Sequence, residues 1–439
     1  MDLIELGKFC SDLDNKNLDK IIKLKFLGFN LWKIYRNKIA GDLYAEFQVK
    51  QSRKYISSWN ILSILNFKKN GLLCRVTSTL YTEIRDGKAR SNRIQNIVNS
   101  YKKSSVNVSL LGVKEQSKIS GCTPEICYDE SVLNNYVKLL KYICLIICAV
   151  PAFFHFVQLK KFTTLTYKNV LAGMSKFTAE YLVFLLFYKF SNIKTVLFMF
   201  ASYGHEGEIA ALQTLSISVE EYQHGHLYSE HYGYNLQSIL NPIKETLLIP
   251  EKFYVYGTHW KEVLLGIGLY SSEQIIVSGN PSFENVEKVI LPFTEKTIIL
   301  VCSHPNSGHL YRKFITNYLL KSHFSKDLRF IVKAHPRESQ LEWIEYCATN
   351  DFVSLVDVDT YSLFQTVDLQ LTGSSTTLFE ANFFEVSNYI LIHDMKITES
   401  SDFDASIGQV IDIDYIGKFE ESEVSSDENK YFGRYQFAG

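Results

Sequence analysis

The feature that most limits the fold of this chain is a regular alternation of short apolar runs with longer amphipathic segments between residues 297 and 392. Five runs are rich in β-branched and aliphatic residues, and helical patterns of roughly eight to fourteen residues separate them. Strands that alternate with helices form a parallel sheet covered by helices. We therefore expect a doubly wound α/β domain here. The five predicted strands are TIILVCSH, LRFIVKAHP, FVSLV, DLQLTG and NYILI.

The same alternation occurs earlier in the chain, from residue 194 to 281. The runs KTVLFMFAS, SISVEEYQHG, KFYVYG and EQIIVSGNP read as strands with helical segments between them. A chain of 439 residues is long enough for two such domains, each with its own core. We predict an N-terminal domain over 1–285 that begins with a helical region of about a hundred residues, a C-terminal domain over 286–420, and a tail over 421–439 that packs on the body or frays.

Composition narrows the class of protein. The formal net charge of −1 gives no whole-chain argument for a nucleic-acid partner. The eight cysteines are scattered and no apolar leader follows Met1, which favours a cytoplasmic location. The segment Tyr142–Val157 carries no formal charge, but it is shorter than the ~20 residues of a spanning helix. We expect a buried or interfacial segment, and its lysine flanks keep peripheral contact with the inner face of the plasma membrane as an alternative.

A cluster of small and hydroxyl residues follows the predicted strand DLQLT. Gly373, Ser374, Ser375 and Thr376 open a helix that holds Glu380. Backbone N–H groups and hydroxyls at such a position can hold a phosphate, whereas plain helix capping explains only one of the hydroxyls.

A second group of candidates follows other strands of the same domain. His335 and Pro336 end the strand LRFIVKA, with Lys333 just before them, and His304 ends the first strand. Together with the serine loop, these residues predict a cradle for the phosphate of a nucleotide.

Candidate catalytic residues lie in the first domain. Glu206 and His224 follow adjacent predicted strands, so they can converge on a hydroxyl that must lose its proton. A buried role for His224 in satisfying a backbone carbonyl is the alternative. The spacing of the histidines does not favour a metal site, and no cofactor motif is found, so we predict neither metal nor cofactor. The predicted lining residues of the same cleft are Gln223, Gly225, His226 and Asn280.

Taken in order, the motifs LGFNLWKIYRNKI, HEGEIAAL, EYQHG, VSGNPSF, VKAHPR and TGSSTTLFEANFF resemble those of GT-B glycosyltransferases of bacterial capsule and lipopolysaccharide assembly. Their combination is similar to sialyltransferases, polysialyltransferases and Kdo transferases. The resemblance implies two Rossmann-like domains facing across a cleft, with Glu206 as base and His335, Ser374 and Ser375 on the phosphate of a CMP-linked donor. The chain departs from the pattern at His205, where the family has an acidic residue.

The sequence therefore predicts a metal-independent glycosyltransferase that uses a nucleotide-sugar donor and a glycan or glycolipid acceptor, and that does not bind nucleic acid. A CMP-activated ulosonic acid such as sialic acid or Kdo is the favoured donor. The alternatives are a UDP- or GDP-sugar transferase or a CDP-polyol phosphotransferase of the same fold, then a nucleotide-sugar epimerase, and last a non-catalytic glycan-binding protein.

Overall fold

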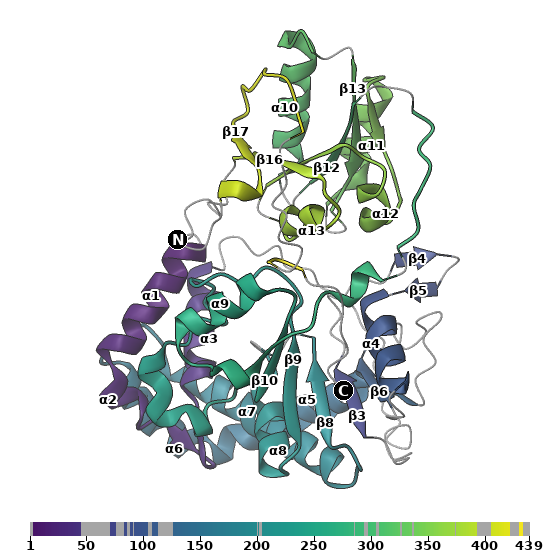
Figure 1. Ribbon diagram of the computed structural model, residues 1–439. Helices are drawn as coiled ribbons and strands as arrows, with labels where there is room; N and C mark the ends of the chain where they lie inside the picture. The colour runs from purple at the N-terminus through teal and green to yellow at the C-terminus, as the bar shows by residue number, and fades with distance from the viewer. Residues whose placement is uncertain are drawn as a thin grey trace. The chain divides into compact units, whose positions relative to one another are not determined.

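The computed structural model divides the chain into two compact units, each of which is described by itself (Figure 1). The first unit runs to Val255 and includes Trp260–Pro281, and the second includes Tyr256–His259 and Ser282–Tyr435. The described residues are 3–44, 71–75, 83–85, 88–90, 92–103, 108–112, 126–199, 201, 204–284, 286–293, 297–303, 307–324, 327–335, 338–373, 375–392, 405–421 and 430–432.

The first unit is built on a seven-stranded sheet with the order β11-β10-β9-β8-β3-β6-β7. All neighbouring strands are parallel. Counted along the chain, this is the order 3-2-1-4-5-6 of a doubly wound domain with one strand added at the edge. The order reverses between β3 and β8, and this is the switch point of the sheet. The strands are β3 (Leu72–Arg75), β6 (Val108–Gly112), β7 (Ile126–Asp129), β8 (Thr195–Phe198), β9 (Ser218–Tyr222), β10 (Lys252–Val255) and β11 (Ile275–Val277).

The predicted helical character of the first hundred residues is only partly right. Helices α1 (Leu3–Lys16), α2 (Leu18–Ile21), α3 (Trp32–Tyr44) and α4 (Asn92–Lys103) are present, but β3 lies between them. Every residue of β3 is buried, so the run LLCR shows no alternation of polar and apolar residues that could mark it as a strand. The short antiparallel pairs β1 (Lys25–Phe26) with β2 (Phe29–Asn30) and β4 (Glu83–Arg85) with β5 (Lys88–Arg90) were also not predicted.

Three helices connect β7 to β8 in the first unit. They are α5 (Glu130–Ile147), α6 (Ala149–Leu159) and α7 (Tyr167–Lys189), and α7 packs against α5, α6 and α8 (Glu206–Thr214). The segment Tyr142–Val157 spans the junction of α5 and α6, where the chain bends by 74°. Among the described residues, α7 is the one unbroken helix long and apolar enough to cross a bilayer, and half of its most apolar window is buried inside the protein.

The remaining elements of the first unit follow its last three strands. They are η4 (Ser238–Thr246), α9 (Thr258–Ile267), η5 (Ser272–Gln274) and η6 (Pro281–Phe283). The first two residues of α9 and the last two residues of η6 belong to the second unit.

The second unit has a six-stranded sheet with the order β14-β13-β12-β15-β16-β17. All its pairs are parallel, and its chain order is again 3-2-1-4-5-6, with the switch point between β12 and β15. The five predicted strands are present, and the short, mostly exposed β17 is an addition. The strands are β12 (Thr297–Cys302), β13 (Leu328–Lys333), β14 (Val353–Leu355), β15 (Leu369–Thr372), β16 (Ser387–Leu391) and β17 (Gln409–Ile411).

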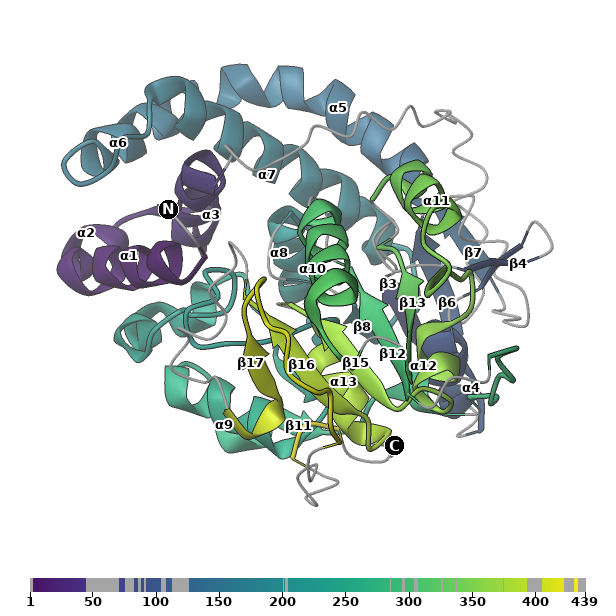
Figure 2. The ribbon, with the colours of Figure 1, turned by 90° about the horizontal axis from the view of Figure 1, so that it is seen from above.

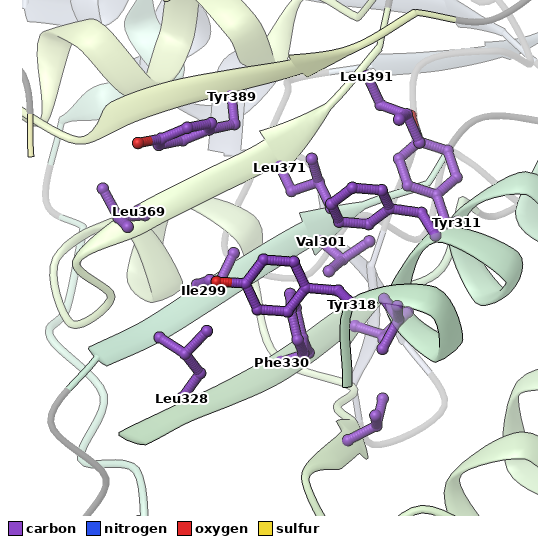
Figure 3. Packing of buried hydrophobic residues seen from close by; sticks show 14 of the residues in the cluster. Ile299, Val301, Tyr311, Tyr318, Leu328, Phe330, Leu369, Leu371, Tyr389 and Leu391 are labelled. Carbon is purple, nitrogen blue, oxygen red and sulfur yellow. The ribbon is translucent and has the colours of Figure 1, made fainter. Parts of the chain in front are cut away.

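Helices cover both faces of the second sheet and explain its sequence pattern. On one face, Tyr311 and Tyr318 of α10 (Gly308–Lys321) lie over Ile299 and Val301 of β12 (Figure 3). A second buried cluster on the other face includes Leu300. A sheet buried on both faces needs apolar side chains at successive positions, so its strands read as continuous apolar runs. The other helices are α11 (Gln340–Ala348), α12 (Thr360–Phe364), α13 (Thr377–Phe383) and η9 (Ala405–Ile407).

Two doubly wound α/β sheets in one chain confirm the fold class that the sequence predicts. The described residues near the C-terminus belong to the second unit. The rings of Tyr431 and Phe379 lie 5.2 Å apart, and those of Phe432 and Tyr256 also lie 5.2 Å apart. Gly257 permits this contact, because a Cβ atom there would lie 2.5 Å from the backbone of Tyr431.

Candidate functional site

The switch point of the second sheet lies where the predicted phosphate loop begins. Cys302 at the end of β12 pairs with Thr372 at the end of β15, and Gly373 follows directly. In open α/β sheets, ligands bind outside the carboxyl ends of the strands at this point. Gly373, Ser375 and Thr376 therefore stand where a ligand is expected, while Ser374 and His304 lie outside the described residues.

Hydrogen bonds order this loop from within. The Ser375 N–H donates to the Gly373 carbonyl at 3.0 Å, and the Thr377 N–H donates to Ser375 Oγ at 3.3 Å. Helix capping thus accounts for the Ser375 hydroxyl, whereas Thr376 makes no capping bond with its side chain. Tyr311, buried beneath the loop, contacts Thr372 and the backbone of Gly373. The loop therefore has a fixed base and a half-buried hydroxyl at Thr376.

His335 and Lys333 reach the same edge from the neighbouring strand β13, which pairs with β12. The His335 N–H donates to Ser303 Oγ at 3.1 Å, and the Glu338 N–H donates to the His335 carbonyl at 2.8 Å. The Ser303 hydroxyl donates to the Glu338 carboxylate, which closes the turn. Lys333 Nζ lies 3.2 Å from a carboxylate oxygen of Asp357. Pro336 lies outside the described residues.

Glu380 is buried on α13, and the Tyr361 hydroxyl donates to its carboxylate at 3.1 Å. Burial raises the pKa of the Cys302 thiol to about 12, and the charge of Glu380 adds to this rise. Glu380 therefore lies close to the end of β12.

The two aspartates of the sequence VDVDT do not form a metal-binding pair. Asp357 is almost fully exposed, and Asp359 caps α12 by accepting the Ser362 N–H at 3.1 Å. Over the part of the chain that the structure describes, no three His, Cys, Asp or Glu side chains gather as metal ligands would.

In the first unit, Glu206 occupies the first turn of α8, after the end of β8, and is 6% exposed. Its carboxylate accepts the Gly204 N–H at 3.1 Å and the Asn37 amide at 3.2 Å. Burial acts to raise the pKa of Glu206, but the ammonium groups of Lys33 and Lys176 and nearby backbone N–H groups hold it below its usual value. Glu206 is therefore a stabilised, weakly basic carboxylate.

Lys33 is fixed in turn by the backbone. Its Nζ donates to the Leu248 carbonyl at 2.6 Å and to the Ala201 carbonyl at 3.3 Å. Burial lowers the pKa of Lys33.

A buried network of charges follows the switch point of the first sheet, and the sequence did not predict it. Arg75, the last residue of β3, donates to Glu208 at 3.0 Å and to Glu130 at 2.7 Å. The Tyr188 hydroxyl donates to Glu208 at 2.6 Å. A usable signal was present in the sequence, because an arginine that ends an apolar strand needs a partner carboxylate when it is buried.

His224 follows the end of β9 and is half-buried. The Tyr234 hydroxyl donates to the buried carboxylate of Glu221 at 2.8 Å and lies 3.5 Å from His224 Nδ1. When the Tyr234 hydroxyl donates its proton to Glu221, its oxygen can only accept from His224, and this favours the imidazole tautomer with the proton on Nδ1. Tyr234 thus contacts the His224 imidazole on its Nδ1 side.

The other predicted lining residues have structural contacts. The Gln223 side chain donates to the Gly225 carbonyl at 2.9 Å and shapes the turn that carries His224. The ring of His226 meets that of Trp260 at 5.3 Å, edge to face. Asn280 is buried beyond the end of β11.

The motif LGFNLWKIYRNKI holds the loop after His224 in place. Arg36 forms a fully buried ion pair with Asp14 at 3.1 Å and donates to the carbonyl and side-chain oxygens of Asn235. Asn235 also donates to the Gly7 carbonyl at 2.8 Å. The first and third helices thus fix the segment that contains Tyr234.

No protein-family model matches the chain, and no curated protein sequence matches it. Similar solved structures include a UDP-GlcNAc 2-epimerase from Methanocaldococcus jannaschii, with 12% identity over 78% of this chain and 89% of that chain and a TM-score of 0.47. A further UDP-N-acetylglucosamine 2-epimerase has 13% identity over 79% and 85% and a TM-score of 0.48. The wall teichoic acid polymerase TagF has 8% identity over 78% and 76% and a TM-score of 0.42. These similarities are too low to transfer an activity or the role of a residue.

Proposed function

We propose that this chain is a glycosyltransferase that moves a sugar from a nucleotide donor, a CMP-linked ulosonic acid in the first instance, to a hydroxyl of a bacterial surface glycan. The observation that carries the proposal is the position of the hydroxyl-rich loop at Gly373–Thr377. It follows β15 at the switch point of a sheet with the strand order of nucleotide-binding domains. Lys333 ends β13, the strand on the other side of β12, and His335 follows two residues later.

The second unit would hold the donor phosphate. The Thr376 hydroxyl and the loop backbone would supply neutral hydrogen-bond donors. The Lys333 ammonium group would leave its exposed partner Asp357 and pair with the phosphate instead. His335 would donate a hydrogen bond to the same group. Donors placed where negative charge develops on a leaving phosphate stabilise the transition state. The preference for CMP rests on the resemblance of the motifs, and the loop geometry serves any nucleotide phosphate.

The first unit would activate the acceptor, and between the two predicted bases the structure favours His224. Glu206 is buried and hydrogen-bonded, and its pKa is held below its usual value, whereas a general base works best with a pKa near the working pH. In the proposed step, the acceptor hydroxyl gives its proton to His224 Nε2 while its oxygen bonds to the anomeric carbon. The bond from that carbon to the phosphate oxygen breaks, and CMP leaves with the electron pair.

Nucleotide binding tests the donor site directly. Calorimetry with CMP, UDP and GDP should show binding of CMP to the unaltered chain. The double variant Ser375→Ala/Thr376→Val should weaken it by about 10- to 100-fold, the effect of losing hydrogen bonds to a charged group. The matched control is Thr349→Ala, which removes a hydroxyl at the C-terminal end of α11. Unchanged CMP affinity in the double variant, or in His335→Ala, would refute the cradle.

Measurement of kcat tests which residue acts as the general base. With CMP-sialic acid or CMP-Kdo and a bacterial capsule oligosaccharide, His224→Gln should lower kcat by about 10²- to 10⁴-fold without weakening CMP binding. Glu206→Gln should retain most of the activity if Glu206 only positions α8. The reverse ranking would transfer the role of base to Glu206. Conversion of a UDP-sugar to its epimer without any acceptor would replace the transferase assignment with an epimerase.

A further inference from the structure

The outer surface of α5 and α6 carries a continuous stripe of exposed apolar side chains. Eight large apolar residues are each between 53% and 80% exposed. Their spacing of three and four residues places them on one side of each helix, and the series continues through the bend at Cys148. We call this set the apolar stripe: Leu139, Tyr142, Ile143, Ile146, Ile147, Val150, Phe153 and Phe154.

The opposite side of the same two helices is already used for packing. Val137 and Cys144 of α5 and Ala152 and Leu159 of α6 are buried, and both helices pack on α7. Figure 2 shows α5 and α6 as an outer layer over α7. The apolar stripe is therefore additional to what the core of the unit needs. A contiguous exposed surface of this kind marks a site of contact with a partner or a membrane.

The charges around the stripe indicate which of these it is. Between Glu130 and Glu180 the sequence contains six lysines and no aspartate or glutamate. Lys138 precedes the stripe by one residue, and Lys160 and Lys161 follow the end of α6, all three exposed. A stripe of aliphatic and aromatic residues bordered by lysines matches an anionic lipid surface, in which acyl chains take the apolar residues and headgroups pair with the ammonium groups.

We propose that the apolar stripe and its flanking lysines dock this protein on the surface of an anionic phospholipid bilayer. The stripe lies on the bilayer and does not cross it, because α6 has eleven residues and so is about 16 Å long, half of the ~30 Å hydrocarbon core. The inner sides of both helices also remain packed on α7. A second copy of the chain is a poorer occupant, since a symmetric contact would bring two lysine-rich surfaces together without carboxylates from this segment.

Sedimentation with vesicles tests the proposal without donor or acceptor, so its outcome is independent of the proposed transferase activity. The full chain should bind vesicles of phosphatidylcholine with phosphatidylglycerol more tightly than vesicles of phosphatidylcholine alone. Ile146→Asp/Phe153→Asp should reduce binding by about tenfold or more. Replacing Lys138, Lys160 and Lys161 with glutamine should cost about fivefold per lysine and only on anionic vesicles, because these charges act through the surface potential.

The control variant is Leu320→Asp, which places one aspartate on an apolar position of α10 in the second unit that is as exposed as Ile146. It should bind vesicles like the unaltered chain. All the altered positions are exposed, so melting temperatures should stay close to that of the unaltered chain. Equal vesicle binding by the unaltered chain and by Ile146→Asp/Phe153→Asp would overturn the proposal. So would a dimer in solution that Ile146→Asp/Phe153→Asp converts to a monomer, since the stripe would then be a contact between copies.

Discussion

The two sheets share one strand order, but the connection from their third strand to their fourth differs. In the second unit, the path from β14 to β15 contains a single helix, α12, of five residues. In the first unit, the path from β7 to β8 contains α5, α6 and α7. The strand order fixes where each switch point lies, and the connection decides what surrounds it.

The two switch points also differ in the burial of the charged groups beside them. Near the first switch point, Arg75 and Glu208 are buried as an ion pair, and the partly buried Glu130 is a second partner of Arg75. Near the second, Ser375 and Thr376 are half-buried, Lys333 pairs with an exposed aspartate, and the buried carboxylate of Glu380 accepts from the Tyr361 hydroxyl. The comparison teaches that the three-helix connection supplies Glu130 and Tyr188 to a network of charges at the first switch point, whereas the second switch point keeps half-buried hydroxyls.

The largest expected effect comes from removing the central arginine of the buried network. Arg75→Met should lower the free energy of unfolding by about 3–5 kcal/mol, because Glu208 and Glu130 lose their buried partner. Arg312→Met in the second unit is the matched control, since its partner Glu342 is 61% exposed and such pairs contribute about 1 kcal/mol or less. Urea denaturation measures both variants. Equal losses would remove the distinction between the two units.

A smaller loss should follow from crowding α7 against α8. A Cβ atom on Gly207 would lie 2.4 Å from Glu180 Cβ and 2.6 Å from the Phe177 carbonyl oxygen. Gly207→Ala should therefore cost about 3 kcal/mol by overpacking. Gly41→Ala, in α3 with open space around it, should instead stabilise by up to about 1 kcal/mol through helix propensity. Melting curves that move in the same direction for both variants would contradict this account.

The smallest effect is a dependence of stability on pH that arises in the three-helix connection. Burial raises the pKa of Glu180 on α7 to about 7, despite the neighbouring Lys176. The folded state therefore holds this proton more tightly than the unfolded state, and the resulting stability is present below pH 4.5 and is lost as the pH rises through 7. Between pH 5 and pH 7 the loss should be about 2 kcal/mol.

Glu180→Gln should flatten the dependence of the free energy of unfolding on pH between pH 5 and pH 7. Denaturation at several pH values measures this slope. Glu130 should act in the opposite sense. Burial alone would raise its pKa, but the Arg75 guanidinium lowers it to about 2, so its contribution is lost only as the pH falls from 4.5 toward 2. An unaltered slope in Glu180→Gln would mean that Glu180 is charged in the folded protein across the whole range.

The parts of the fold that the sequence predicted well have a common physical basis. Each of the five predicted strands of the second sheet is bounded by polar turns, and each adjoining helix has its own apolar pattern. β3 escaped detection because a strand of four residues buried on both faces resembles any short apolar run. Of the candidate site, the order of strand ends was enough to place Glu206, His224, His335 and the loop at Gly373 at the carboxyl edges of their sheets. Ser374, Pro336 and His304 stay predictions outside the described residues.

The sequence by itself determined the fold class, the strands of the second sheet and the residue types at its switch point, because these follow from local periodicity and turn chemistry. Only the tertiary structure decided which charged residues are partners. Arg75 and Glu208 are 133 residues apart in the chain, and Arg36 and Asn235 are 199 apart. Local patterns carry no information at such separations. Whether a carboxylate is a free base or a stabilised ion depends on the groups that folding brings beside it, and for Glu206 these are Lys33 and Asn37.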